Sequence, residues 1–342
     1  MPDSILPSLE ALLSRAPWWL RGPPYWSDHV QTIWAPLWAR RCQTTLLPWR
    51  RERCTTPDGD FIDIDWLDDV NSAGLPNSPL LVLFHGLEGS SASHYAQAFA
   101  DVCRRRRWCL AIPHFRGCSG ELNLAPRAYH SGDFEEIGWM LARCKASHGP
   151  GPIWAAGVSL GGNALLRWAQ EAGSMAAKEV KAIAAVSAPL DLGVSGRALC
   201  GGFNRHVYGR MFLRTMKPKA LRKLQQHPGL FDRSALMASR DLYEFDHVFT
   251  APLHGFKNTD DYWQKASSRP GLKSMALPTL LINALNDPFV PLEALPSRHA
   301  VSPYVTLVQP SQGGHVGFVR GAWPGEVTSL PEAVLDWMVN HA

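Results

Sequence analysis

Short apolar runs alternate with stretches of helical spacing along most of the chain. Residues 60–66 alternate apolar and polar side chains, which is typical of a half-buried strand. Continuous apolar runs that fit buried strands follow at residues 80–84 and 108–112, and further strand candidates lie at residues 153–156, 180–186, 280–282 and 304–308. Helical patterns lie between them, for example at residues 95–107 and 163–172. This alternation predicts an α/β fold with a mostly parallel central sheet and helices on both faces.

The alternation stops between residues 192 and 273, where the pattern is mainly helical and irregular. We interpret this stretch as an insertion between two strands of one α/β core. An insertion above the strand ends of such a fold commonly forms a lid. The predicted organisation is an N-terminal extension at residues 1–22, a core at residues 23–191 and 274–342, and a helical lid at residues 192–273.

A stretch near the N-terminus has apolar side chains at roughly helical spacing: Ile5, Leu9, Leu12, Leu13 and Ala16. We expect a helix that packs on its own domain. The alternative is a weak contact with a membrane surface, for which the segment offers few cations. The stretch does not resemble a signal peptide, because no Lys or Arg precedes it and Glu10 and Arg15 interrupt it. No uninterrupted apolar run of about 18 residues occurs, so no membrane-spanning helix is expected.

Composition and charge narrow the classes of function. The 342 residues are 46% hydrophobic and 19% charged, which indicates a globular protein with a full core. The net charge is +4, and the one basic run, at residues 104–107, closes a predicted helix where cations complement the helix dipole and face water. A nucleic-acid partner is therefore not expected. The seven cysteines are irregularly spaced without a CxxC pair, which favours a cytoplasmic protein over a disulfide framework.

Residues 157–161, with the sequence Gly-Val-Ser-Leu-Gly, match the pattern G-x-S-x-G. A nucleophile on a tight strand-to-helix turn needs small neighbours, and glycines two residues to either side remove the side chains that would clash. A predicted strand at 153–156 and a predicted helix at 163–172 flank the pattern. We therefore predict that Ser159 is a nucleophile at a helix N-terminus, where developing negative charge is favoured. The alternative is an ordinary glycine-rich turn.

A serine hydroxyl needs a base to take its proton, and the base needs an acid to orient it. In folds with this serine turn the chain order is serine, acid, histidine. Asp287 and His315 each follow a predicted strand, so both should lie on loops at the carboxyl ends of strands. We predict a triad of Ser159, Asp287 and His315. Asp191, which follows an earlier predicted strand, is the alternative acid.

The negative oxygen of a tetrahedral intermediate is usually stabilised by two backbone N–H groups. One should belong to the residue after the nucleophile, Leu160. The other should come from the loop after the strand predicted at residues 80–84. Leu87, in the run His-Gly-Leu-Glu-Gly-Ser at residues 85–90, is the predicted donor. We interpret His85 in this run as a structural hydrogen-bonding residue and not as a second base.

Six blocks of the chain form a specific combination: His85–Ser90, Arg116–Gly120, Gly157–Asn163, Ser187–Leu192, Asn286–Pro288 and the run His29-Val30-Gln31-Thr32. Together they resemble the YheT-type hydrolases, a bacterial branch related to the eukaryotic abhydrolase-domain lipid and ester hydrolases. The resemblance spans residue 23 to the C-terminus. It implies an α/β-hydrolase fold and a carboxylic-ester hydrolase whose triad falls on Ser159, Asp287 and His315. One departure is the run Asp261-Tyr262-Trp263, where the family tends to have a tyrosine pair after an acidic residue.

The function that the sequence favours is a serine esterase without a cofactor, acting on small-molecule esters with short-to-medium or lipid-like acyl groups. Several residues of the predicted lid are candidates to line an acyl pocket, unless they only pack the lid on the sheet: Phe203, Tyr208, Met211 and Phe212. The same triad would serve a thioesterase, an amidase or an acyltransferase, and a catalytically silent binding module is the third alternative. No HxH or HExxH pair is present, so no metal site is predicted.

Overall fold

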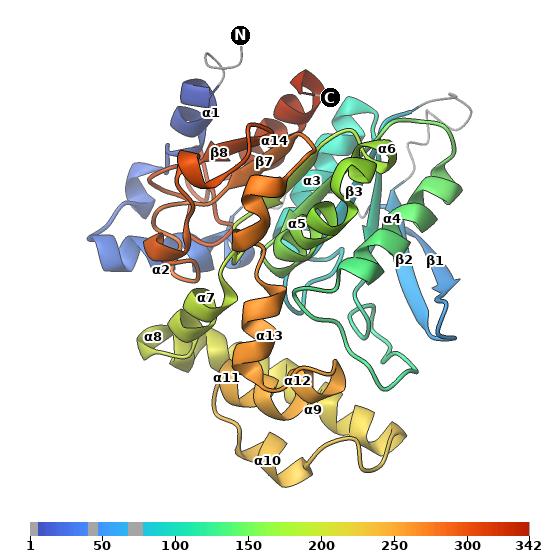
Figure 1. Cartoon of the computed structure of the whole chain (residues 1–342). Helices are drawn as coiled ribbons and strands as arrows, with labels where there is room; N and C mark the ends of the chain where they lie inside the picture. Colours follow the sequence, from blue (N-terminus) through green and yellow to red (C-terminus); the bar gives the residue numbers. More distant parts are fainter. Residues whose placement is uncertain (1–5, 40–46, 68–77, 342) are drawn as a thin grey trace.

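The structure is a computed structural model that describes residues 6–39, 47–67 and 78–341. In these ranges a sheet of eight strands has the order β1-β2-β4-β3-β5-β6-β7-β8 (Figure 1). The strands are β1 (Arg50–Thr55), β2 (Phe61–Leu67), β3 (Leu80–Phe84), β4 (Cys109–Pro113), β5 (Ile153–Val158), β6 (Ile183–Val186), β7 (Thr279–Ile282) and β8 (Val305–Val308). β2 is antiparallel to both of its neighbours, and the other pairs are parallel. The predicted mostly parallel sheet is therefore confirmed.

Helices cover both faces of the sheet, and each face closes a separate apolar core. Three helices contribute side chains to one core: α4 (Phe134–His148), α5 (Leu160–Ala172) and α6 (Ala176–Glu179). Three others contribute to the opposite core: α1 (Leu6–Leu13), α3 (His94–Arg106) and α14 (Ser329–Asn340). β3 and β5 lie in the middle of the sheet and are buried along their whole length. Such strands hold the loops at their ends in fixed positions.

The apolar runs predicted as buried strands are all present, with small shifts at their ends. β6 starts three residues later than the pattern indicated, at Ile183. The preceding helix α6 ends at Glu179, and the Val180 N–H donates to the Ala176 carbonyl to close its last turn. The first residue of the run, Val180, therefore completes a helix end before the strand begins.

β2 is present as predicted, but the prediction that only one of its faces is buried is wrong. All seven of its residues are buried. Asp63 and Asp65, on the expected polar face, accept paired N–H groups from Arg53 and Arg51 of β1 at 2.7–2.9 Å. The carboxylates exchange water for guanidinium groups, so they can be buried without losing hydrogen bonds. The polar sequence of β1 gives no strand signal, so its cover over β2 was not predicted.

The chain between β6 and β7 forms a helical segment, residues 192–273, which lies beside the α/β core in the lower part of Figure 1. Its helices are α7 (Leu192–Leu199), α8 (Gly202–Asn204), α9 (Arg210–Gln226), α10 (Arg233–Ala238), α11 (Leu242–Phe245), α12 (Ala251–Leu253) and α13 (Thr259–Ala266). The two ends of the segment are tied together. The Leu192 N–H donates to Ser267 Oγ at 2.9 Å, and the Arg269 N–H donates to the Leu190 carbonyl at 2.9 Å. The segment therefore leaves and rejoins the core at one place.

The N-terminal helix α1 packs on its own domain, as expected, with Leu9 and Leu13 buried in the core that α14 also closes. Ile5, the first residue of the predicted pattern, lies outside the described residues. Trp18, beyond α1, is 81% exposed. Helix α2 (Pro24–Leu37) follows and precedes β1. None of the helices in the described ranges combines the length and apolar character that crossing a membrane requires.

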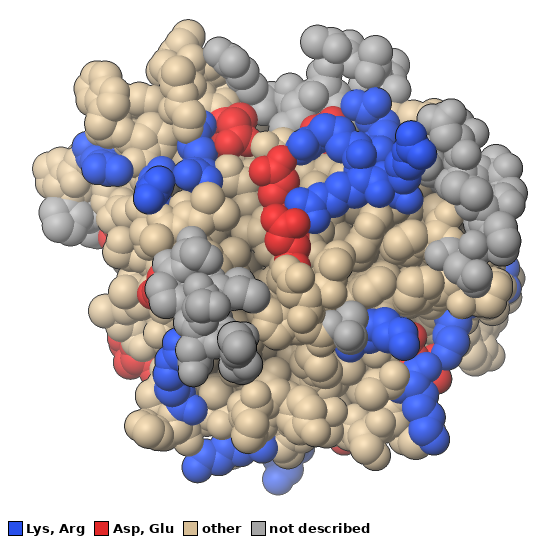
Figure 2. Space-filling view, turned by 90° about the horizontal axis from the view of Figure 1, so that it is seen from above, with Lys and Arg blue, Asp and Glu red and all other residues tan. Residues whose placement is uncertain are grey.

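The largest group of basic side chains on the face shown in Figure 2 lies beside a line of acidic side chains, and smaller groups lie elsewhere on this face. The basic run at the end of α3 is ion-paired with α14: Arg105 lies 2.9 Å from Glu332, and Arg106 lies 2.6 Å from Asp336. These charges join two helices of the core. Five cysteines of the described ranges are free thiols, namely Cys54, Cys103, Cys118, Cys144 and Cys200, and Cys42 lies outside those ranges. The cytoplasmic location stays a prediction.

Candidate active site

Ser159 occupies a sharp turn between β5 and α5. Its backbone has φ +53° and ψ −120°, a conformation that residues other than glycine rarely adopt. The Ser159 N–H donates to the Val186 carbonyl at 2.8 Å, and the Ser159 carbonyl accepts the N–H groups of Gly162 and Asn163. Hydrogen bonds from the neighbouring strand and the new helix therefore hold the strained turn in place.

Close backbone contacts require the glycines that flank Ser159. A Cβ at Gly161 would lie 2.5 Å from the His85 carbonyl oxygen, and a Cβ at Gly157 would collide with the Gly161 carbonyl. Gly86, in the loop after β3, is also close, since its Cβ would meet Ser159 Cβ at 3.2 Å. The small residues of both loops thus let the backbone of the β3 loop approach the serine.

Asp287, His315 and Ser159 form a chain of hydrogen bonds. Ser159 Oγ lies 3.0 Å from His315 Nε2, and His315 Nδ1 lies 2.9 Å from Asp287 Oδ2. The Asp287 carboxylate only accepts, so Nδ1 carries the proton and Nε2 is left to accept from the serine hydroxyl. The second carboxylate oxygen accepts the Phe289 N–H at 2.8 Å. The Asp287 side chain is fully buried and that of His315 is 11% exposed. The structure thus brings together three residues that the sequence places on separate loops.

The alternative acid, Asp191, lies elsewhere and has other partners. It precedes α7 as the N-cap, where its Oδ1 accepts the Val194 N–H at 3.0 Å. Its Oδ2 lies 3.3 Å from Arg269 at the exit of the helical segment. Asp191 therefore caps a helix and joins the two ends of the segment.

His85 is a buried structural residue. Its Nε2 accepts the Phe115 N–H at 3.1 Å, so its Nδ1 carries the proton and donates to the Gly86 carbonyl at 2.8 Å. Burial lowers the pKa of His85 to about 3, which keeps the ring neutral. Within the described residues as a whole, no group of three or more His, Cys, Asp or Glu side chains is placed to hold a metal ion.

The backbone N–H groups of Leu87 and Leu160 are available to a ligand. Both residues line the same cavity as Ser159. Leu160 is the first residue of α5, where a backbone N–H has no acceptor within the helix. Neither N–H donates to an acceptor among the residues that the structure describes.

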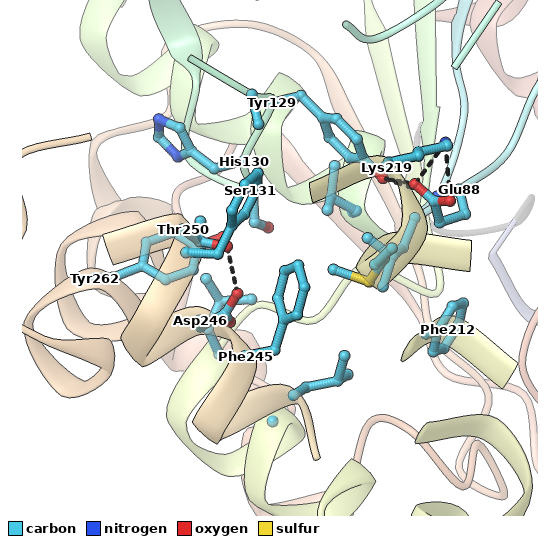
Figure 3. Close-up of a pocket in the computed structure, with 18 of the residues that line it drawn as sticks. Glu88, Tyr129, His130, Ser131, Phe212, Lys219, Phe245, Asp246, Thr250 and Tyr262 are labelled. Carbon is cyan, nitrogen blue, oxygen red and sulfur yellow. Dashed lines mark hydrogen bonds and ion pairs between the residues drawn. The ribbon is translucent and has the colours of Figure 1, made fainter. Parts of the chain in front are cut away.

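The loop that carries Leu87 is fixed through Glu88, whose φ is +57°. The Glu88 N–H donates to the Tyr129 hydroxyl at 3.0 Å, and that hydroxyl donates to Glu88 Oε1 at 2.9 Å. Burial raises the pKa of Tyr129, so the hydroxyl keeps its proton. Lys219 of α9 reaches the same carboxylate, with Nζ 2.8 Å from Oε2 (Figure 3). The helical segment therefore contacts the side chain of Glu88, the residue after Leu87, an interaction that the sequence did not indicate.

Ser159 and His315 lie in the wall of a cavity. Its empty volume is about 1170 Å³, part of which is open to solvent. The helical segment supplies most of its apolar wall: Leu192, Leu199, Phe212, Met216, Leu242, Phe245, Phe249 and Trp263. Of the four aromatic and Met candidates from the sequence, Phe212 lines this cavity. Phe203 and Tyr208 instead pack against His29 of α2, and Met211 is 53% exposed, because these side chains lie on other sides of their helices.

Asp246 is a partly buried acid in the cavity wall that sequence reasoning missed. It lies in a π-helical turn, Asp246–Thr250, between α11 and α12. Thr250 Oγ1 donates to its Oδ1 at 2.6 Å (Figure 3), and Trp263 Nε1 donates to its Oδ2 at 2.9 Å. Burial raises the pKa of Asp246 to about 6. The one feature of the sequence that pointed to this acid was its partner Trp263, which stands where the resembled family tends to have a second tyrosine.

A mostly parallel sheet that carries a serine on a strained strand-to-helix turn is typical of α/β hydrolases. A family model for the α/β hydrolase fold matches residues 79–322, and the chain belongs to that family. A solved esterase from Pyrococcus furiosus, Pf2001, has the same fold, with a TM-score of 0.52 and 18% identity. That match covers 88% of this chain and 99% of the other.

Within the family, the chain is similar to YheT from Escherichia coli strain K12. The two are 37% identical over 320 residues, which cover 92% of this chain and 90% of YheT. The chain is also 30% identical over 339 residues to mouse phospholipase ABHD3, across 93% of this chain and 80% of the relative. The resemblance to YheT-type proteins that the sequence blocks indicated is therefore confirmed.

Proposed function

We propose that the protein is a serine hydrolase of carboxylic esters, with Ser159 as nucleophile, His315 as general base and Asp287 as the acid that orients the base. The observation that carries this proposal is the hydrogen-bonded chain from Ser159 Oγ through both ring nitrogens of His315 to a buried carboxylate, at the wall of a large cavity. The name of the mouse relative, a phospholipase, supports ester hydrolysis as the class of reaction.

In the first half of the proposed reaction, Ser159 Oγ attacks the acyl carbon of the ester while His315 Nε2 takes the hydroxyl proton. Asp287 holds the Nδ1 proton in place and stabilises the imidazolium that forms. When the tetrahedral intermediate collapses, Nε2 gives its proton to the leaving alkoxide, and the alcohol departs. A water molecule then attacks the acyl-serine by the same proton transfers, which releases the acid and restores Ser159.

Leu87 and Leu160 are proposed to stabilise the oxyanion through their backbone N–H groups. The position of Leu160 at the start of α5 adds the favourable end of the helix dipole. Loss of one oxyanion donor typically costs about 3 kcal/mol of transition-state stabilisation. Because Glu88 holds the peptide next to Leu87, the contacts of Tyr129 and Lys219 with Glu88 are expected to fix the direction of this donor.

The helical segment is proposed to act as a lid and acyl pocket over the triad. Its apolar side chains face the cavity, and its two ends meet at one place, as a hinged element requires. An apolar wall of this kind favours acyl chains of short to medium length or lipid-like esters over charged acyl groups. The substrate class proposed is therefore a carboxylic ester with an apolar acyl chain.

The proposal is tested with p-nitrophenyl acetate, butyrate, octanoate and palmitate and with the Ser159→Ala variant as control. We expect the wild type to hydrolyse butyrate and octanoate faster than acetate. In Ser159→Ala, kcat should fall by several orders of magnitude. Hydrolysis of none of these esters by the wild type, or an unchanged rate in the variant, contradicts the proposal. A higher kcat/KM for thioesters or anilides of the same acids would replace the ester assignment by a thioesterase or an amidase.

A further inference from the structure

Helix α2 lies far from the triad in sequence, yet it contacts the loops that carry Asp287 and His315. Gln31 and Thr32 of this helix are buried, at 2% and 7% exposure. They belong to a block that the family resemblance singled out without assigning it a role. Their side chains do not line the cavity and instead make hydrogen bonds to the two loops.

Thr32 fixes the backbone of His315. Its hydroxyl accepts the His315 N–H at 2.9 Å and donates its own proton to the Asp28 carbonyl at 2.7 Å. Because the single hydroxyl proton is used within α2, a lone pair of the oxygen faces the His315 N–H. Valine has nearly the same shape but no acceptor, so it would leave that N–H without a partner.

Gln31 joins the loop of the acid to the loop of the base. Its Oε1 accepts the Gly313 N–H at 2.8 Å and an N–H of the Asn286 side chain at 3.1 Å. Asn286 Oδ1 in turn accepts the Gly314 N–H at 2.9 Å. The residue before the acid and the two residues before the base are therefore held in one network that is anchored on α2.

Two glycines allow the loop of the base to approach α2. Gly314 has φ +56°, and a Cβ there would lie 2.8 Å from the Thr32 backbone nitrogen. A Cβ at Gly317 would collide with the Gln31 carbonyl oxygen. The loop around His315 is thus fitted closely to the backbone of α2, in addition to its hydrogen bonds.

We propose that Gln31 and Thr32 are positioning residues, which hold the loops of Asp287 and His315 so that the imidazole lies between the carboxylate and Ser159. The effect on rate rests on the proposed function, because the position of His315 limits the rate only if His315 is the base. A misplacement of about 1 Å can cost about 10²-fold in rate. Loss of one hydrogen bond loosens a loop without displacing it fully, so a smaller effect is expected.

The test compares Thr32→Val and Gln31→Leu with Thr32→Ser, which keeps the hydroxyl. Thr279→Val is the matched control, because Thr279 is fully buried and its hydroxyl donates to the Leu277 carbonyl, at the end of β7 remote from Asp287. With p-nitrophenyl butyrate, kcat should fall about tenfold in Thr32→Val and in Gln31→Leu, which corresponds to about 1.4 kcal/mol. KM should stay within about twofold, because the side chains of Gln31 and Thr32 do not line the cavity.

Thr32→Ser and Thr279→Val are expected to keep kcat within about twofold of the wild type. Thermal unfolding shows which variants are folded at the assay temperature, and Thr32→Ala replaces Thr32→Val if the latter is unfolded. Unchanged kcat in folded Thr32→Val and Gln31→Leu would overturn the proposal. An equal loss of kcat in Thr279→Val would also overturn it, because the loss would then follow stability alone.

The ring N–H of His315 gives a second readout that does not depend on ester hydrolysis. A proton donated to a buried carboxylate resonates far downfield in the NMR spectrum, and His315→Ala identifies the signal by its loss. We expect the signal in the wild type and in Thr279→Val, and a shifted or broadened signal in Thr32→Val. An unchanged signal in Thr32→Val contradicts the positioning role. A signal that responds as expected in a protein without esterase activity would support the positioning network and refute the proposed function.

Discussion

The α/β core and the helical segment contribute to the same cavity in different ways. In the core, Ser159, Asp287 and His315 follow β5, β7 and β8, so buried strands set their positions. The helical segment carries no member of the proposed triad, but it supplies most of the apolar wall and several polar groups, among them Lys219 and Asp246. We therefore propose that the core determines the reaction and that the segment selects the substrate. Substitutions in the two regions should therefore change different kinetic parameters.

The largest effect in this comparison is expected for the acid of the core. Asp287→Asn keeps the size of the side chain but removes the charge that holds the His315 proton, so kcat should fall by about 10³-fold or more. Asp191→Asn, at the entrance of the helical segment, is the matched control, and its kcat should stay within about threefold of the wild type. Steady-state kinetics with p-nitrophenyl butyrate measures both. A larger loss of kcat in Asp191→Asn would show that Asp191, and not Asp287, is the acid that orients His315.

The next effect concerns Asp246 and the stability of the protein as a function of pH. Because burial raises the pKa of this acid from an ordinary 3.8 to about 6, the folded protein keeps a proton that the unfolded chain releases between those values. The stability that Asp246 contributes therefore falls as pH rises through that window, by about 3 kcal/mol in total. Urea unfolding of the wild type and of Asp246→Asn across this range should show this loss in the wild type alone. Parallel pH profiles of the two proteins would show that the carboxyl ionises freely in the fold.

A smaller effect, on substrate choice, is expected when a side chain that the helical segment contributes to the cavity wall is shortened. Phe212→Ala removes a ring from the wall, so KM for p-nitrophenyl octanoate should rise about tenfold while kcat changes little. Met211→Ala is the matched control, because this neighbour on α9 is 53% exposed and does not line the cavity. Equal changes in the two variants, or a loss of kcat in place of a rise in KM, would mean that the segment does not select the acyl chain.

The smallest effect tests the alternative that the N-terminal segment makes a weak contact with a lipid surface. Trp18 is 81% exposed on the N-terminal side of the core, and tryptophan favours the boundary between lipid and water. Trp18→Ala should lower the fraction of protein that sediments with anionic lipid vesicles about twofold. Val339→Ala, at another exposed apolar site on α14, should leave the fraction unchanged. Equal sedimentation of the wild type and Trp18→Ala would exclude the N-terminal segment as the contact.

The core could be predicted from the sequence because its constraints are local. Strands buried on both faces read as short apolar runs, and G-x-S-x-G reflects contacts that a Cβ at Gly157 or Gly161 would break. The order of Ser159, Asp287 and His315 follows from the topology, which brings the carboxyl ends of parallel strands to one edge. β1 was missed because its arginines compensate the buried aspartates of β2, a pairing that only the register of the two strands reveals.

The helical segment and α2 could not be predicted to the same depth, because their roles depend on contacts between residues far apart in the chain. Lys219 meets Glu88 across 131 positions, and Thr32 meets His315 across 283. Irregular helices also have no clear hydrophobic period that would separate cavity-lining from exposed residues. The sequence therefore could not show that Phe212 lines the cavity and Met211 does not. Only the packing of α9 against the core distinguishes them.

The central claim is that Ser159 is the activated nucleophile of this fold, and covalent labelling tests it most directly. A fluorophosphonate probe reacts with serines whose hydroxyl is activated by a neighbouring base. Mass spectrometry of the labelled and digested wild type should find one probe per chain, on the peptide that contains Ser159. Ser159→Ala should not be labelled, and His315→Ala should be labelled far more slowly. Labelling at another residue, or equal labelling of Ser159→Ala, would contradict the account.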